Sequence, residues 1–558
     1  MIRQSLSLSP GFHRMRLRVC RQETISRSVF RDRSAKAQVL HSMSARLVLV
    51  FLAILLAVPA ACANVTVPDV ISNSMVLQHD QIVPIWGTAD PGETVVVKFA
   101  SQTQTAQAGA DGKWQVTLKS MSASITPSTM TISGNNTITL DDVLVGEVWI
   151  VSGQSNMQFT LAESADGQAA IAAANDPAIR LFNISRKVAF QHESGPLALW
   201  QAVSPESVRG FSAAGYYFAV QLRNALHMPV GVINSSYGGT QAEAWTPVEY
   251  LLASPYLQPC VERTKIWDEE RPRVKAEYEQ RMQQWREAAE KAKAEGRRPP
   301  SEPRLPDALR ESRIAASIYD RMIAPLIPFA IRGVIWYQGE SNEDRAQQYE
   351  LLLPTLIKAW RERWGEGNFP FGIVQLPNYR DARPQPSDEP WSFLREAQRR
   401  TALATANSGL IVTIDIGEVH DIHPKDKLDV GKRMARWALV TAYHQKMTAS
   451  GPVFRNAKLK GSKLVLTFDD VGKGLRIRGG GKLEEFAVAG ADHQWHWASA
   501  KIEGRNRLAV WSDAVPQPEA VRYAFNSNPR NPNLTDDTGL PAAPFRSDSW
   551  PGPTDGKR

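Results

Sequence analysis

The chain has 558 residues, and at about 150 residues per domain this length predicts three or four domains. Its formal net charge of +8 would suit an anionic partner such as nucleic acid. The basic excess, however, lies in residues 1–63, where ten Lys and Arg residues outnumber two acidic residues. Residues 64–558 are therefore close to neutral, which argues against nucleic acid as a partner of the main body.

Residues 43–63 have the pattern of a secretion signal. A positive start at Arg46 precedes an unbroken apolar run at 47–58, and the small residues at 61–63 offer a cleavage site. The run is too short to cross a bilayer, which takes about 20 residues. We therefore expect cleavage after Ala63, no membrane association after processing, and a secreted or periplasmic location.

Two points about this leader, residues 1–63, stay open. Lipidation of Cys62 is the alternative to cleavage after Ala63, although Pro59 is a poor residue three positions before a lipidated cysteine. Residues 1–42 have no evident function, which raises the alternative that translation begins at Met43.

The cysteines are Cys20, Cys62 and Cys260, and removal of the leader would leave only Cys260. One remaining cysteine excludes a disulfide framework and a thiolate metal cluster in the mature chain. Cys260 follows a proline, and we expect a packed thiol there rather than a nucleophile.

Residues 64–141 show short strands of alternating hydrophobicity, separated by turn residues such as those at 89–92. Strands at this spacing predict a small antiparallel β-domain, and it contains no evident catalytic cluster. The strand-like runs are SMVLQ, IVPIWG, ETVVVKFA, KWQVTLK and TMTISG.

From residue 142 to about residue 450, nearly continuous apolar runs alternate with helical stretches. Such runs are typical of strands that are buried on both faces, as in a parallel sheet covered by helices, so the expected fold class is α/β. Each run ends in Gly, Ser, Asn, Asp or Glu. The runs are LVGEVWIVSG, MPVGVINSSYGG, AIRGVIWYQGES, PFGIVQLPN and GLIVTIDIGE.

A charged insertion interrupts this pattern at 251–310. Apolar residues recur there every three or four positions, which predicts one amphipathic helix. They are Val274, Tyr278, Met282, Trp285 and Ala289. We interpret it as a surface helix packed on the sheet domain, and a lid over the site is the alternative. After a helix at about 426–444, residues 451–558 return to β-rich texture and end in a proline-rich tail.

Four short segments end or follow the apolar runs and carry residues capable of chemistry. They are GQSNM at 153–157, NSSYGGT at 234–240, YQGESN at 337–342 and DIHP at 421–424. Open α/β folds place their chemistry at the carboxyl ends of the strands. Each segment alone is a weak signal, but together they offer a nucleophile, an oxyanion site and a base.

A serine hydroxyl such as that of Ser155 needs an adjacent base, and the imidazole of His423 suits this because its ordinary pKa is near neutrality. A carboxylate on the other ring nitrogen would fix the tautomer. Backbone N–H groups beside glycine can stabilise a developing oxyanion. The side-chain amides of Gln338 and Asn342 supply further donors.

These segments together resemble the sialate O-acetylesterase branch of the SGNH hydrolases. The resemblance extends to SMVLQ, to EAWTP at 243–247 and to PAAPFRSDSWPG at 541–552, so that it covers most of the chain after the leader. It implies a flavodoxin-like sheet that carries a serine esterase needing no metal or other cofactor. In this interpretation the esterase domain spans 142–450 and is flanked by β-rich regions at 64–141 and 451–558.

The resemblance also implies the roles of individual residues. Ser155 would be the nucleophile, with its own N–H as one oxyanion donor, and His423 the base. Gly238 or Gly239 would give a second donor. Gln338 stands where the wider family usually has Asn, and we expect it to give the third.

The acid departs from the wider pattern, which places it three residues before the histidine. His420 occupies that position here, and Asp421 lies two residues before His423. We therefore expect Asp421 to orient the imidazole. Asp415, Glu418 and a Ser–His dyad without a carboxylate remain alternatives.

Glu340 could be interpreted as the acid of a glycosidase, but that chemistry needs a second carboxylate across the scissile bond, and none has a comparable signature. We expect Glu340 to hold the site loop instead. Trp149, Trp245, Trp336 and Trp391 could face a sugar, although burial in the sheet core is the more common case.

The sequence thus predicts a carbohydrate O-acetylesterase of the sialate 9-O-acetylesterase type, whose partner is an acetylated sugar or glycan. Acetylated xylan or xyloglucan is an alternative substrate, and a non-catalytic carbohydrate-binding protein is an alternative of another class. The sequence specifies neither the sugar, nor the position of the acetyl group, nor the oligomeric state.

Overall fold

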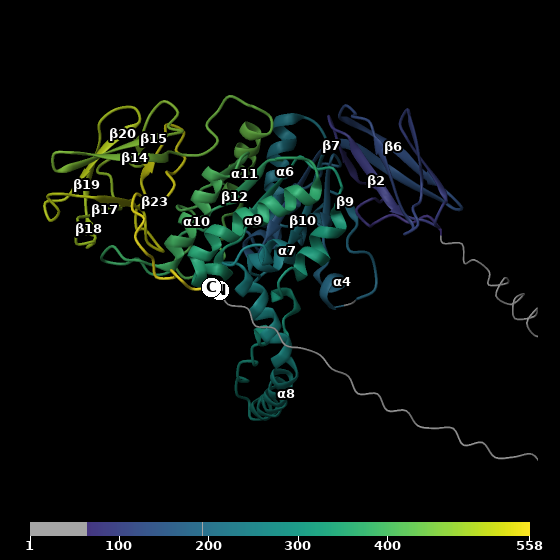
Figure 1. Cartoon of the computed structure of the whole chain (residues 1–558), viewed down its shortest axis with the longest axis horizontal. Coiled ribbons are helices and arrows are strands. Elements are labelled where there is room, and N and C mark those ends of the chain that lie inside the picture. The colour runs from purple at the N-terminus through teal and green to yellow at the C-terminus, as the bar shows by residue number, and fades with distance from the viewer. Residues whose placement is uncertain (1–63, 192) are drawn as a thin grey trace, which may run out of the picture. The chain divides into compact units, whose positions relative to one another are not determined.

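The computed structural model describes residues 64–191 and 193–558, all within one compact unit (Figure 1). The expected leader at 1–63 lies outside the described residues. None of the helices in the described part is long and apolar enough to cross a membrane.

A parallel sheet forms the centre of this unit. In order across the sheet its strands are β13 (Ser408–Ile411), β12 (Phe371–Val374), β11 (Gly333–Tyr337), β7 (Thr137–Gly153), β10 (Val230–Ser236), β8 (Ile179–Asn183) and β9 (Trp200–Ala202). All neighbouring pairs are parallel except β8 and β9. The order β10-β7-β11-β12-β13 is 2-1-3-4-5 along the chain, the flavodoxin-like order, with β8 and β9 added at one edge. The expected α/β class is therefore confirmed.

Helices cover both faces of this sheet, which explains the nearly continuous apolar runs. Along β7, Val148 and Ile150 pack on one face, against residues of α9 (Ala346–Trp364) and α10 (Pro390–Ala404). Trp149 and Val151 pack on the other face, against α6 (Ala213–Leu226) and α11 (Lys427–Thr441). The alternation follows from the two-residue period of a strand.

The shorter helices and turns lie between these elements. The α-helices are α2 (Ser155–Gln158), α3 (Gly167–Ala172), α4 (Arg186–Gln191), α5 (Pro205–Arg209) and α7 (Val248–Leu252). The 3-10 helices are η1 (Leu161–Glu163), η2 (Ala242–Trp245), η3 (Asp307–Leu309), η4 (Glu311–Arg313), η6 (Ala324–Leu326) and η7 (Glu340–Arg345), and η5 (Tyr319–Ile323) is a π-helix.

The N-terminal region consists of short strands, as the alternating pattern predicts. They are β1 (Val76–Gln78), β2 (Val83–Thr88), β3 (Thr94–Phe99), β4 (Gln102–Gln107), β5 (Lys113–Leu118) and β6 (Ser124–Ser133). The structure differs from the expectation at the boundary after residue 141. β7 runs through it, pairing first with β6 and then with β10 and β11. One strand thus joins the N-terminal strands to the central sheet.

The insertion forms α8 (Gln258–Ala294), which contains Pro272. The residues of the expected apolar face, from Val274 to Ala289 at helical spacing, are half-buried, whereas most residues between them are exposed. Trp285 donates its indole N–H to the carbonyl of Pro300 at 2.9 Å, which ties the helix to the returning chain.

The C-terminal region is β-rich with its own apolar core. One antiparallel sheet contains β14 (Val453–Lys460), β15 (Lys463–Asp469), β20 (Arg507–Trp511) and β19 (Ser499–Ile502), and a second contains β18 (His496–Trp497), β17 (Phe486–Ala489), β21 (Ala520–Tyr523) and β23 (Phe545–Arg546). β16 (Arg476–Ile477) pairs with β22 (Leu534–Thr535). The tail returns to α9, where the hydroxyl of Thr554 accepts a hydrogen bond from the Gln347 N–H at 3.4 Å.

Candidate active site

Three strand ends meet at one edge of the central sheet. Gly153 at the end of β7 is in register with Ser236 at the end of β10 and with Tyr337 at the end of β11. The chain therefore delivers the segments at 153–157, 234–240 and 337–342 to the same place. This is the point at which the strand order reverses, where open α/β sheets bind their ligands.

The turn after β7 presents Ser155 at the start of α2. Gly153 has φ +132°, and a Cβ there would lie 2.1 Å from the carbonyl oxygen of Tyr337, so the turn requires glycine. The side-chain oxygen of Gln154 accepts hydrogen bonds from the N–H groups of Gly339 and Ser341, both at 3.3 Å. These bonds hold the segment that contains Ser155 against the segment that follows β11.

His423 reaches Ser155 from the segment before α11. Its Nε2 lies 2.8 Å from Oγ of Ser155, and its ring stacks on Phe159 with 6.3 Å between ring centres. Burial lowers the pKa of His423 below its ordinary value, as does Lys427, whereas Asp421 and Glu163 oppose the lowering. The geometry is that of a hydroxyl beside the base that would remove its proton.

Of the three carboxylates considered for His423, Asp421 is in contact with it. One Asp421 oxygen accepts a hydrogen bond from the His423 backbone N–H at 2.9 Å, and the same oxygen lies 3.8 Å from Nδ1, beyond hydrogen-bonding distance. Asp415 is instead paired with Arg433 and Arg478. Glu418 accepts a hydrogen bond from the Lys425 N–H at 2.8 Å.

The glycine turn after β10 lies against Ser155. A Cβ on Gly238 would be 3.2 Å from Cβ of Ser155, so this backbone approaches closely. The Gly238 N–H donates to the side-chain oxygen of Gln158 at 2.7 Å. An oxyanion would therefore have to replace that oxygen to use this donor. Gly239 has φ +72° with open space around a Cβ.

The structure gives Gln338 and Asn342 partners other than those expected. The Gln338 amide nitrogen donates to the Thr240 carbonyl at 3.1 Å and to Oδ1 of Asn342 at 2.7 Å. The Asn342 amide nitrogen donates to Glu243 at 2.8 Å, and both side chains are buried. Their amides thus brace the turn that carries Gly238, and we do not assign either one as an oxyanion donor.

Glu340 lies at the start of η7 and is held by Asn156, the residue after Ser155. The Asn156 amide donates to one carboxylate oxygen of Glu340 at 2.6 Å, and the other oxygen is buried without a partner. Burial raises the pKa of Glu340. The residue as a whole is half-buried, and its bond to Asn156 ties the start of η7 to the turn that carries Ser155.

Sequence reasoning missed two residues around Ser155. Lys427, the first residue of α11, is buried and donates to the Asn156 side-chain oxygen at 2.6 Å. Gln158 is bound to Gly238. Gln158 follows the GQSNM segment, which is a signal of proximity, but nothing in the sequence separates the buried Lys427 from the exposed Lys425.

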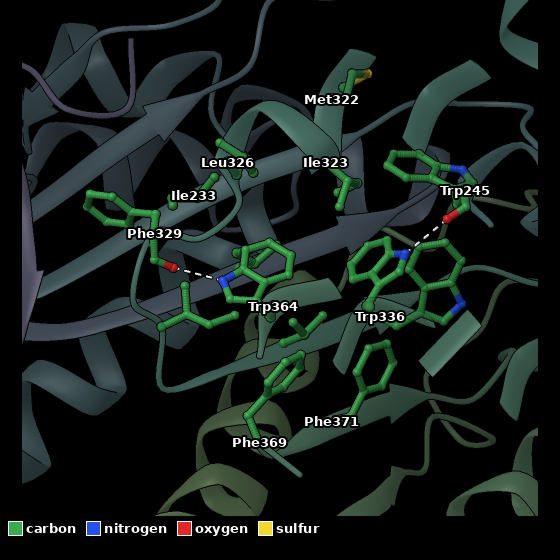
Figure 2. Packing of buried hydrophobic residues seen from close by; sticks show 14 of the residues in the cluster. Ile233, Trp245, Met322, Ile323, Leu326, Phe329, Trp336, Trp364, Phe369 and Phe371 are labelled. Atoms are coloured by element: carbon green, nitrogen blue, oxygen red, sulfur yellow. Dashed lines mark hydrogen bonds between the residues drawn. The ribbon is translucent and has the colours of Figure 1, made fainter. Parts of the chain in front are cut away.

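The tryptophans that could have faced a sugar are core residues. Trp149, Trp245, Trp336 and Trp391 are all buried. Figure 2 shows Trp245 and Trp336 among the buried apolar side chains, and their ring centres are 5.5 Å apart. The backbone oxygen of Trp245 accepts the indole N–H of Trp360 at 2.9 Å. Cys260 is buried too, and burial raises the pKa of its thiol to about 12, so it is not a nucleophile.

Across 64–191 and 193–558, no group of three or more His, Cys, Asp or Glu side chains is placed to hold a metal ion.

Comparisons with known proteins show which family the chain belongs to. The sequence model of the family described as "carbohydrate esterase, sialic acid-specific acetylesterase" matches residues 145–296 and 309–440, about half of the chain. The match includes all four chemistry-bearing segments identified in the sequence.

Individual relatives extend over more of the chain. Sialate O-acetylesterase from Homo sapiens is 27% identical over 85% of this chain and 91% of its own length. The enzyme from Mus musculus is 29% identical over 72% of this chain and 78% of its own length. The crystal structure of a carbohydrate acetylesterase from Xanthomonas citri is 35% identical, covers 87% of this chain and all of its own, and superposes with a TM-score of 0.71. The chain therefore belongs to the sialic acid-specific acetylesterase family of carbohydrate esterases, and it is a carboxylic-ester hydrolase.

Proposed function

We propose that the protein is an exported carbohydrate O-acetylesterase that removes acetyl groups from sugar hydroxyls with Ser155 as nucleophile and His423 as base. The observation that carries the proposal is the 2.8 Å contact between Nε2 of His423 and Oγ of Ser155 at the switch point of the sheet. Export is supported by the signal-like pattern at 43–63.

In the first half of the reaction, Oγ of Ser155 attacks the acetyl carbonyl carbon while Nε2 of His423 takes the hydroxyl proton. A tetrahedral intermediate forms with its negative charge on the former carbonyl oxygen. The intermediate collapses, the bond to the sugar oxygen breaks, and the imidazolium returns the proton to the departing sugar hydroxyl. The enzyme now carries an acetyl group on Ser155.

Two backbone donors are placed to stabilise the oxyanion. Ser155 opens α2, so its N–H has no acceptor within the helix. The Gly238 N–H lies on the neighbouring turn and is bound by Gln158 before substrate arrives. Displacement of Gln158 by the oxyanion would release the second donor, and each such donor contributes about 3–4 kcal/mol to catalysis.

In the second half, water attacks the acetyl-enzyme and loses a proton to His423. Acetate leaves as Oγ of Ser155 recovers that proton. Asp421 assists both halves through its negative charge, which favours the imidazolium. At 3.8 Å from Nδ1 it does not lock the tautomer by a direct hydrogen bond in this structure.

A polar cavity lined by Gln158, the residue that binds the Gly238 N–H, supports an acidic sugar as substrate. Its volume is about 290 Å³, and it contains the half-buried guanidinium of Arg186. Burial lowers the pKa of Arg186, and no carboxylate lies within 4 Å of it in the described residues. The side chains of Asn183, Asn234 and Ser236 form a hydrogen-bonded row along the cavity. Arg186 lies 5.8 Å from the ring centre of Tyr237. A cation without a carboxylate partner, among hydroxyl and amide groups, suits a sugar that carries a carboxylate, which favours O-acetylated sialic acid.

Acetylated xylan or xyloglucan remains the alternative substrate, because the same ester chemistry would serve a neutral glycan. The discriminating experiment compares acetate release from 9-O-acetylated sialic acid and from acetylated xylan, using wild type and Arg186→Gln. If the acidic sugar is the substrate, the substitution lowers the ratio of the two rates. An unchanged ratio would favour the neutral glycan. Arg209→Gln, at an exposed arginine of α5, is the matched control.

The esterase proposal itself is tested by measuring acetate and reducing sugar together. An esterase releases acetate alone, a glycosidase releases reducing sugar, and a binding protein releases neither. Ser155→Ala should reduce acetate release by several orders of magnitude, on the scale seen when a nucleophile of this type is removed. Retention of more than about a tenth of wild-type turnover would remove Ser155 from the mechanism.

A further inference from the structure

Lys427 is a buried cation directly behind the proposed nucleophile. The side chain is 0% exposed, and its ammonium lies 4.9 Å from the ring centre of Phe159 and 5.6 Å from that of Tyr337. A buried ammonium is costly unless it is paired or has a function. No carboxylate lies within 4 Å of Nζ in the described residues, and its hydrogen bond goes instead to an amide, Oδ1 of Asn156 at 2.6 Å.

Asn156 connects Lys427 to both Ser155 and His423. It is adjacent to Ser155 in the chain and is itself 0% exposed. Its amide nitrogen donates to the backbone carbonyl of Ile422 at 2.9 Å and to Glu340 at 2.6 Å. Because Ile422 immediately precedes His423, one side chain ties the nucleophile turn to the segment of the base, and Lys427 fixes the orientation of that side chain.

Lys427 also acts on His423 through its charge. Both groups lie near Phe159: the imidazole stacks on its ring, and the ammonium is 4.9 Å from the ring centre. The charged groups that act on His423 are Asp421 on its own segment, Glu163 of η1 and Lys427. Those that act on Lys427 are Glu340, Asp421, Glu418 and Asp426, and burial lowers its pKa to about 7. Protonated Lys427 disfavours the imidazolium form of His423.

We propose that Lys427 is a positioning residue for ester hydrolysis. Through Asn156 it holds the Ser155 hydroxyl and the His423 imidazole at hydrogen-bonding distance, and its positive charge opposes protonation of the imidazole. The proposal rests on the serine mechanism above. Lys427 is buried behind the turn, so its loss should lower kcat and leave KM nearly unchanged. Misplacement of reacting groups by about 1 Å can cost on the order of 10²-fold in rate.

The test compares Lys427→Met with Lys425→Met, which makes the same change at an exposed lysine two residues away. We expect Lys427→Met to lower kcat at least tenfold and to move the acid limb of the kcat/KM profile to higher pH, because the charge opposing imidazolium is gone. Lys425→Met should match wild type in both. Lys427→Gln keeps an N–H donor without the charge. It should recover part of kcat but not the position of the acid limb.

An activity-independent readout separates this proposal from the esterase proposal. The His423 imidazole is titrated by NMR in the full chain, with its signal assigned by its absence in His423→Gln. The His423 pKa should be higher in Lys427→Met, and in Lys427→Gln if the first variant does not fold, than in Lys425→Met. Equal pKa values together with equal kcat would overturn the proposal. A wild-type protein that releases no acetate would overturn the esterase proposal, and the titration would still decide the question of Lys427.

Discussion

At the scale of single residues, the two ring nitrogens of His423 differ in how closely each is approached by its proposed partner. Nε2 of His423 is 2.8 Å from Oγ of Ser155, whereas Nδ1 is 3.8 Å from Asp421. The side chains of His423 and Asp421 are 37% and 45% exposed, so solvent weakens their interaction. In the proposed mechanism, Asp421 therefore acts on His423 mainly through its negative charge and through its hydrogen bond with the His423 backbone N–H.

This geometry predicts a graded response to substitution. Asp421→Asn should lower kcat by less than His423→Ala does, because the base remains and loses only a weakly coupled charge. The double variant should be little worse than His423→Ala alone, because residues that act as a unit are not additive. Turnover on an aryl acetate measures all three, and an Asp421→Asn loss equal to that of His423→Ala would show a direct tautomer lock.

Asp415→Asn should behave differently, as a stability variant. Its carboxylate is 7% exposed and pairs with Arg433 at 2.7 Å and Arg478 at 2.6 Å. Removing one partner of a fully buried ion pair costs about 3–5 kcal/mol, and the 39% exposure of the Arg478 side chain makes the expected cost smaller here. Denaturant unfolding should show this loss, while kcat per folded molecule stays close to wild type. A steep fall in kcat at unchanged stability would instead make Asp415 the acid.

The pH dependence follows from the environment of His423. A general base works only when unprotonated, so kcat/KM falls as pH drops through the His423 pKa. Burial, and then Lys427, lower that pKa against the opposing pull of Asp421 and Glu163. The midpoint of the acid limb should therefore lie below about 6.5, the ordinary value for histidine. A midpoint above that value, measured with an uncharged aryl acetate, would contradict the assignment.

At the scale of elements, the turn between β10 and η2 offers a matched pair of glycines. A methyl group on Gly238 would meet Cβ of Ser155 and the oxygen of Gln158, both at 3.2 Å. Gly238→Ala should therefore lower kcat strongly. Gly239 has open space but φ +72°, so Gly239→Ala should cost about 1–2 kcal/mol of stability with a smaller effect on kcat. Parallel kinetics and thermal unfolding measure both, and equal kcat values would show that the turn does not approach the reacting carbonyl.

Strand ends were the part of the site that the sequence could predict. Apolar runs that end in small polar residues mark the carboxyl edge of a parallel sheet. This pattern alone predicts that Ser155 and Gly238 lie at the same edge. Gln338 shows where such reasoning stops. An amide beside a predicted site can serve as an oxyanion donor or can brace a neighbouring loop. The side-chain amide of Gln338 donates its hydrogen bonds to the Thr240 carbonyl and to Oδ1 of Asn342. Those contacts depend on packing between segments far apart in the chain.

Lys427 and β7 illustrate the same limit. A lysine two residues from another lysine carries no pattern that predicts burial, and only the docking of α11 on the sheet makes Lys427 part of the site. The change of texture near residue 142 predicts a domain boundary, but β7 continues through it because one extended strand can pair with β6 and then with β10 and β11.

At the scale of the whole molecule, the β-rich C-terminal region is joined to the sheet domain by buried polar contacts. Arg395 of α10 donates to the carbonyls of Asn526 and Ser527. Asn378, after β12, donates to the side chain of Asn528 at 3.0 Å. Arg478 of the C-terminal region pairs with Asp415 in the loop after β13 at 2.6 Å. The C-terminal residues thus support the loops that follow β12 and β13, the second of which leads to His423.

The reaction as proposed draws its nucleophile and its base from the chain itself. The full-length enzyme should therefore keep its turnover after dialysis against a strong chelator, because Ser155 and His423 need no metal-activated water. Acetate release before and after dialysis is the measurement. A loss that zinc or calcium restores would contradict the serine mechanism.

The most direct test of the central claim is covalent trapping of the nucleophile. The full-length enzyme is treated with diethyl p-nitrophenyl phosphate, and residual esterase activity is compared with the site of modification found by peptide mass mapping. The serine mechanism predicts one adduct per chain, on Ser155, forming in proportion to the loss of activity and much more slowly in His423→Ala. Full activity in a chain modified at Ser155, or inactivation with the adduct on another residue, would contradict it.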